Sequence, residues 1–95
     1  MSRRIFQRRS FDRWVRERLV DQALDRYLDW RAESEAVDRA YGAWSRAPAA
    51  EGALPFAAYR AALDREERAA SVYGAVVRRL ECLFGAERDA QPAAA

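Results

Sequence analysis

A heptad pattern between Phe56 and Phe84 constrains this chain more than any other feature of its sequence. Apolar residues recur there at alternating steps of three and four, with one polar interruption at Glu66. The repeat consists of Phe56, Tyr59, Leu63, Ala70, Tyr73, Val77, Leu80 and Phe84. This spacing places the apolar side chains along one side of a helix, as in a coiled-coil seam. The pattern therefore predicts a long helix that packs against another helix.

The boundaries of two long helices follow from the residues that break or cap them. The stretch before residue 47 has no proline, and Ser10 is suited to cap a helix that starts there, so we expect a helix over about residues 10–46. Pro48 and Gly52 interrupt residues 47–54, which we expect to form a loop. Pro55 suits the first turn of a second helix over about residues 55–84, and Gly85 is typical of the position after a helix end.

The first helix carries a seam that matches the second. Its residues are Val20, Ala23, Tyr27, Trp30, Ser34, Val37, Tyr41 and Trp44. If the chain folds back on itself, seam residues whose numbers add to about 100 meet. Ser34 then falls opposite Glu66, so the polar residue of one seam meets the polar residue of the other. We expect the Ser34–Glu66 layer to set the register of an antiparallel two-helix hairpin in an all-α protein.

Apolar residues outside both seams predict a further interface. They are Phe11, Trp14, Val15, Leu24, Leu28, Ala62, Ala69, Val76 and Leu83. A lone hairpin cannot cover them as well as its seam, and an uncovered apolar patch is typical of an interaction site. We expect two copies to complete a four-helix bundle as a homodimer, with packing against another protein as the alternative.

The residue types that catalysis and metal binding most often use are scarce. The chain has no histidine and a single cysteine, Cys82, which by itself offers neither a disulfide nor a cysteine zinc site. Glu66 alone is too little for general acid–base chemistry. We therefore expect no catalytic residue, no metal site, no cofactor and no small-molecule substrate, and we interpret the chain as a non-enzymatic interaction or assembly protein.

The N-terminus is the basic part of the chain. Residues 1–18 hold seven arginines against two acidic residues, which leaves the rest of the chain acidic. The candidate anion-binding residues are Arg3, Arg4, Arg8, Arg9 and Arg13. One interpretation is a solubilising arm over residues 1–9 that pairs with acidic helix surface. The alternative is a small binding module for nucleic acid or an anionic membrane, although no recognised nucleic-acid motif accompanies these arginines.

Acidic residues recur at every fourth position along the first helix. They are Glu17, Asp21, Asp25, Asp29 and Glu33. Like charges at this spacing repel weakly, so the ladder is interpreted as a solvated face that nearby arginines partly neutralise. A docking strip for an arginine-rich partner is the other interpretation.

The chain as a whole has the size of one small domain. We expect a basic arm over residues 1–9, a hairpin domain over residues 10–84 and a flexible tail over residues 85–95. No apolar run approaches the roughly 20 residues that span a bilayer, and no signal-peptide pattern follows the first arginines. We therefore expect a cytoplasmic protein. All 17 basic residues are arginine, which indicates a GC-rich genome and a bacterial origin.

Overall fold

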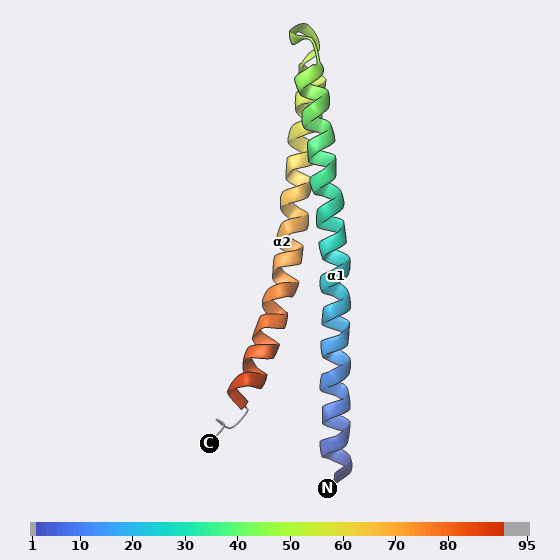
Figure 1. Ribbon diagram of the computed structural model, residues 1–95, viewed down its shortest axis with the longest axis vertical. Helices are drawn as coiled ribbons and strands as arrows, with labels where there is room; N and C mark the ends of the chain where they lie inside the picture. The colour runs from blue at the N-terminus through green and yellow to red at the C-terminus, as the bar shows by residue number, and fades with distance from the viewer. Residues whose placement is uncertain (1, 91–95) are drawn as a thin grey trace.

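The computed structural model describes residues 2–90 as two long helices joined by a tight connection (Figure 1). Helix α1 spans Ser2–Arg46, a single 3-10 turn η1 spans Ala49–Glu51, and helix α2 spans Ala53–Ala90. The two helices pack against each other in opposite directions, and residues 2–90 contain no strand. The predicted antiparallel two-helix hairpin is confirmed.

The connection is shaped by hydrogen bonds at the two helix ends that it joins. The Ser45 hydroxyl donates to the carbonyl of Tyr41 at 2.8 Å, and the Ala47 amide donates to the carbonyl of Trp44 at 3.1 Å. On the far side of the turn, the Phe56 amide donates to the carbonyl of Gly52 at 2.9 Å. Proline at position 55 lies in this first turn of α2, where a missing N–H leaves no helical hydrogen bond unmade.

Both helices are longer than the sequence predicted. Helix α1 already begins at Ser2, so the backbone of residues 2–9 continues the helix predicted over residues 10–46. Helix α2 continues past residue 84 to Ala90. Gly85 does not end it, because no described glycine has a positive φ. Neither extension contains a proline, and residues 86–90 are rich in alanine and charged helix formers. Residues 91–95 of the expected tail lie outside the described part of the chain.

The register of the hairpin matches the prediction along most of its length. Ring centroids lie 5.0 Å apart for Trp44 and Phe56 near the connection. Further along, they lie 5.6 Å apart for Tyr41 and Tyr59 and 5.7 Å apart for Tyr27 and Tyr73. Near the open end, the Arg16 guanidinium carbon lies 5.8 Å from the centroid of the Phe84 ring. In each of these contacts the two residue numbers add to 100, as predicted for the two seams, and the contact of Arg16 extends this register beyond the predicted seam.

The face that α2 turns toward α1 differs from the predicted one. The buried hydrophobic residues of the described chain are Ala62, 1% exposed, and Val76, 6% exposed. Both were predicted to lie beside the seam on a free interface, together with Ala69 and Leu83, which are half-buried. Leu63, predicted within the seam, remains 38% exposed. Helix α2 is therefore rotated about its own axis, because small residues such as Ala62 let the two backbones approach closely.

The hairpin is a single layer. Its principal extents are 74 × 29 × 13 Å, and the shortest of these is close to the width of one helix. The radius of gyration is 21.4 Å, against about 13 Å for a compact domain of this length. The helices lie together near the connection and diverge toward their free ends (Figure 1). Since none of residues 2–90 lies above or below this layer, most of their large side chains keep one side in solvent.

Candidate interaction surface

A line of half-exposed apolar side chains runs along the hairpin. It consists of Val20, Tyr27, Tyr41, Phe56, Leu63 and Phe84, which are between 38% and 51% exposed. We call these six residues the apolar strip. Those of α1 recur at multiples of seven residues, and so do those of α2, so each set follows one side of its helix.

Both halves of the strip lie on the same side of the hairpin. In an antiparallel helix pair, the two a positions of the heptad fall on one side of the contact and the two g positions on the other. The strip residues occupy a, whereas the buried Ala62 and Val76 occupy g on α2. Tyr41 and Phe56 also touch the opposite helix through aromatic rings. The strip is thus one continuous band beside the helix–helix contact.

The predicted interface residues of α1 are found on its outer surface. Leu24 and Leu28 are more than half exposed and lie on the turns of α1 next to the strip residues Val20 and Tyr27. They widen the strip near the middle of the hairpin. Phe11 and Trp14 are also more than half exposed, with ring centroids 6.1 Å apart. Val15 is half-buried.

The predicted polar layer contains an additional donor. The Trp30 indole Nε1 donates to Glu66 Oε1 at 2.7 Å, which joins the two helices through a partly buried hydrogen bond. Glu66 thus accepts from tryptophan, and the structure gives no hydrogen bond between Glu66 and Ser34, which is itself half-buried. The Trp30 ring also stacks on Tyr73, with centroids 5.7 Å apart and an interplanar angle of 12°. The Trp30 donor was missed because its seam position indicated only packing.

The edge of the hairpin opposite the strip is more polar. Arg65 Nε donates to Glu33 Oε2 at 3.3 Å across the two helices. A shallow groove of about 150 Å³ on this edge is lined by Arg26, Asp29, Arg68, Ala69 and Val72. Its charged lining contrasts with the aromatic and aliphatic lining of the strip.

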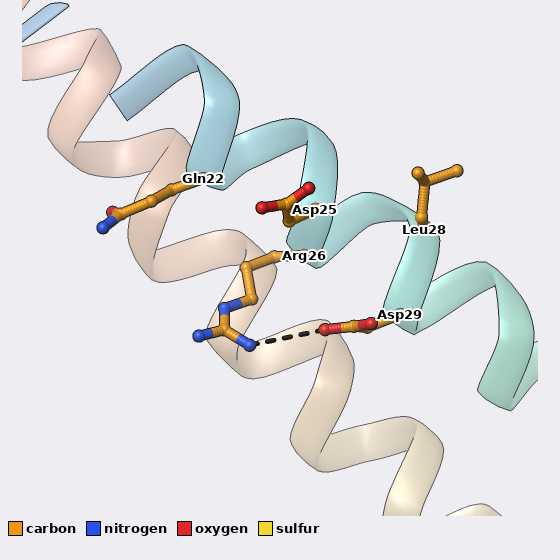
Figure 2. A pocket seen from close by; sticks show the side chains of 5 residues that line it. All are labelled: Gln22, Asp25, Arg26, Leu28 and Asp29. Atoms are coloured by element: carbon orange, nitrogen blue, oxygen red, sulfur yellow. Dashed lines mark hydrogen bonds and ion pairs between the residues drawn. The ribbon is translucent and has the colours of Figure 1, made fainter. Parts of the chain in front are cut away.

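The acidic ladder lies on the outer surface of α1. A depression of about 390 Å³ includes two of its members and is lined by Gln22, Asp25, Arg26, Leu28 and Asp29. In this depression, Asp29 pairs with Arg26 at 3.3 Å, and Leu28 points away from that pair (Figure 2). All five lining residues come from one helix and are exposed, so the depression is a shallow feature of a solvated face.

The predicted anion-binding residues lie at the start of α1. Arg9 and Arg13 are exposed, and the side chains of Arg3, Arg4 and Arg8 lie outside the described part of the structure. Arg18 lies one turn after Trp14, with its guanidinium carbon 5.7 Å from the centroid of the indole ring. The basic and aromatic side chains are thus interleaved on the first turns of α1.

The described residues outside the strip form no cluster of metal-binding side chains. Cys82 is exposed. Within residues 2–90, no group of three acidic or cysteine residues is placed to hold a metal ion. Neither helix, over the same residues, has a stretch that is long and apolar enough to cross a membrane. The strip is the feature of this surface with the clearest chemical character.

The strip could have been found from the sequence. Its six residues were all assigned to the predicted seam, which holds more apolar positions than a single helix pair buries. The sequence does not show which side of this broad seam is covered by the other helix of the hairpin. Comparison of the chain with known protein families, with characterised proteins and with solved structures finds no match.

Proposed function

We propose that this chain is a non-enzymatic assembly protein of the cytoplasm, whose hairpin self-associates and so offers a docking platform for protein partners. The observation that supports this most strongly is the apolar strip, whose six residues remain between 38% and 51% exposed. Exposed apolar bands of this kind are typical of protein–protein interfaces. Aromatic residues, which make up two of the three strip members on each helix, are also enriched at such interfaces.

The area of exposed surface supports the same proposal. A compact monomer of 10.9 kDa exposes about 5,600 Å². This chain exposes 8058 Å², which is larger by about 2,500 Å². Obligate homodimers bury about 1,000–2,500 Å² on each protomer. The excess surface is therefore of the size that a stable dimer covers.

Light scattering coupled to size-exclusion chromatography tests the proposal at micromolar concentration. The wild-type chain is expected to have twice the mass of 10.9 kDa. Leu63→Glu places a charge in the strip and is expected to give a monomer that remains helical by circular dichroism. Val72→Glu is the matched control, because Val72 is 45% exposed but lies on the polar edge. A monodisperse wild-type monomer would overturn the proposal.

A second function has support from the start of α1. The exposed Arg9 and Arg13 flank Phe11, which is 61% exposed, and Trp14 follows at 55%. Interleaved basic and aromatic side chains suit an anionic membrane surface or stacked bases. Binding of anionic vesicles and of an oligonucleotide to the chain, followed over a salt series, tests this function. Arg9→Gln with Arg13→Gln is expected to weaken binding and to flatten its salt dependence, and unchanged binding would reject it.

A further inference from the structure

We infer that a second copy of this chain covers the apolar strip face to face, about a twofold axis parallel to the long dimension of the hairpin. In this arrangement the two connections lie at the same end, and α1 of each copy lies on α2 of the other. The inference rests on the self-association proposed above and adds its geometry. Three observations support it: heptad positions that the hairpin leaves exposed, charged residues beside the strip, and the open space at Gly74.

The hairpin uses only half of its heptad positions internally. Burial of Ala62 and Val76 places the g side of α2 against α1, and Trp30 and Tyr73 meet there at d positions. The strip residues at a positions keep 38% to 51% of their surface in solvent, although three of them also contact aromatic rings of the opposite helix, and the charged e residues beside them are exposed. In a four-helix bundle each helix contacts two neighbours, so the second neighbour must be met by this a and e side.

Charged residues flank the strip in complementary pairs. Arg31 and Asp38 occupy e positions on α1, each four residues after an a position. Arg60 and Glu67 occupy the equivalent e positions on α2. All four are exposed, and none of them makes an ion pair among the described residues of the hairpin. Arg31 lies at the height of Glu67, and Asp38 at the height of Arg60, in the register fixed by the aromatic contacts.

The direction of the twofold axis decides which charges meet. An axis parallel to the hairpin keeps every residue at its height and exchanges the helices, so Arg31 faces Glu67 of the second copy, and Asp38 faces Arg60 of the second copy. Each pair then occurs twice. An axis across the hairpin instead sets α1 on α1, and the charges that meet then depend on where along the hairpin the axis crosses. The parallel axis is favoured because it forms both opposite-charge pairs together and sets Leu24 at the level of Gly74 of the second copy. Its one like-charged pair, Glu17 with Glu81, lies toward the open end.

Gly74 on α2 leaves space for a side chain of the second copy. Leu24 is 58% exposed and lies at the height of Gly74 on α2. A Cβ atom added at Gly74 would meet only the flexible end of Arg78, at 3.3 Å from its Nη1. The surface above Gly74 is therefore open, and Leu24 of the second copy can pack on the bare backbone there. A glycine in the middle of a long helix is otherwise unfavourable by about 1 kcal/mol relative to alanine.

Mixing two charge-reversal variants tests this geometry. In Arg31→Glu alone, both intermolecular pairs with Glu67 become repulsive, and the same holds for Glu67→Arg alone. Each homodimer is expected to weaken about tenfold, because an attraction is replaced by a repulsion twice in the dimer. When the two variants are mixed, both pairs regain opposite charges. The heterodimer is then expected to return to within about threefold of wild-type affinity.

Sedimentation equilibrium measures the affinities, and native mass spectrometry identifies the heterodimer because the two variants differ in mass. Arg39→Glu is the matched control, since Arg39 is exposed on α1 away from the strip and its reversal changes the net charge equally. It is expected to keep wild-type affinity. A wild-type dimer whose single variants are not weakened, or whose mixture shows no recovery, would overturn this geometry and leave self-association intact. A wild-type monomer would instead overturn the proposed function itself.

Discussion

The indole of Trp30 on α1 donates a 2.7 Å hydrogen bond to the carboxylate of Glu66 on α2, at the level where the two seams are otherwise polar. The same ring stacks on Tyr73 with an interplanar angle of 12°. One side chain thus satisfies a partly buried acidic group and packs against the neighbouring aromatic layer. Hydrogen bonds to charged groups are among the stronger individual contributions to stability.

Removing this donor is expected to destabilise the hairpin. Trp30→Phe keeps an aromatic ring but leaves Glu66 without its partner, so the free energy of unfolding should fall by about 1.5–3 kcal/mol. Urea denaturation followed by circular dichroism measures the change. Trp44→Phe is the matched control, because Trp44 stacks on Tyr59 through its ring and the structure gives its indole nitrogen no hydrogen bond. Equal losses in both variants would show that the hydrogen bond contributes nothing of its own.

The rotated seam of α2 predicts different responses at two adjacent alanines. Ala62 is 1% exposed against α1, so Ala62→Leu should destabilise the hairpin by about 1–3 kcal/mol through overpacking. Ala61 is exposed, and Ala61→Leu should change stability by no more than about 0.5 kcal/mol. Thermal and urea unfolding compare the two. If the Ala61 variant were the less stable, the orientation of α2 described above would be wrong.

The ion pair between Arg65 and Glu33 is expected to contribute little. Its side chains are 47% and 33% exposed, and pairs of this kind are worth about 0.2–1 kcal/mol in water. Arg65→Ala should therefore lower the free energy of unfolding by less than about 1 kcal/mol, with less effect at high salt. A salt-independent loss as large as that of Trp30→Phe would contradict this ranking of the two contacts.

Replacing Gly42 or Gly74 by alanine should raise the stability of the folded hairpin in both cases, but only one of the two replacements should change the affinity of the dimer. Gly42→Ala and Gly74→Ala should each raise helix stability by about 0.5–1 kcal/mol, since each added Cβ meets only a flexible arginine side chain. Gly74→Ala should in addition weaken the dimer, because it fills the space assigned to Leu24 of the second copy. Unfolding curves and sedimentation equilibrium separate the two effects. A dimer of unchanged affinity in Gly74→Ala would remove the glycine from the interface.

The fold and the register could be predicted because the heptad pattern and the position of the break determine which residues share a level. Trp44 meets Phe56 and Tyr27 meets Tyr73 as the seam numbering required. The side of α2 that is buried against α1 could not be predicted. Apolar residues occupy a, d and g positions on α2, and only the partner's approach selects among them. Ala62 is buried and Leu63 remains 38% exposed, because a small residue at the contact lets the two helices approach more closely.

The helix ends and the added hydrogen bond were beyond the sequence for other physical reasons. Gly85 can either end a helix or continue it, and here the following residues favour continuation to Ala90. Ser10 can cap a helix, but nothing before it prevents α1 from starting at Ser2. The Trp30–Glu66 bond depends on a side-chain rotamer, which periodicity does not encode.

Small-angle X-ray scattering on an absolute intensity scale tests most directly whether a second copy covers the single-layer hairpin. A face-to-face dimer doubles the mass of 10.9 kDa while its longest dimension stays close to the 74 Å of one hairpin. Its thickness should rise from one helix layer to two. A particle of single-chain mass, or a dimer that is about twice as long and still one helix thick, would contradict the account.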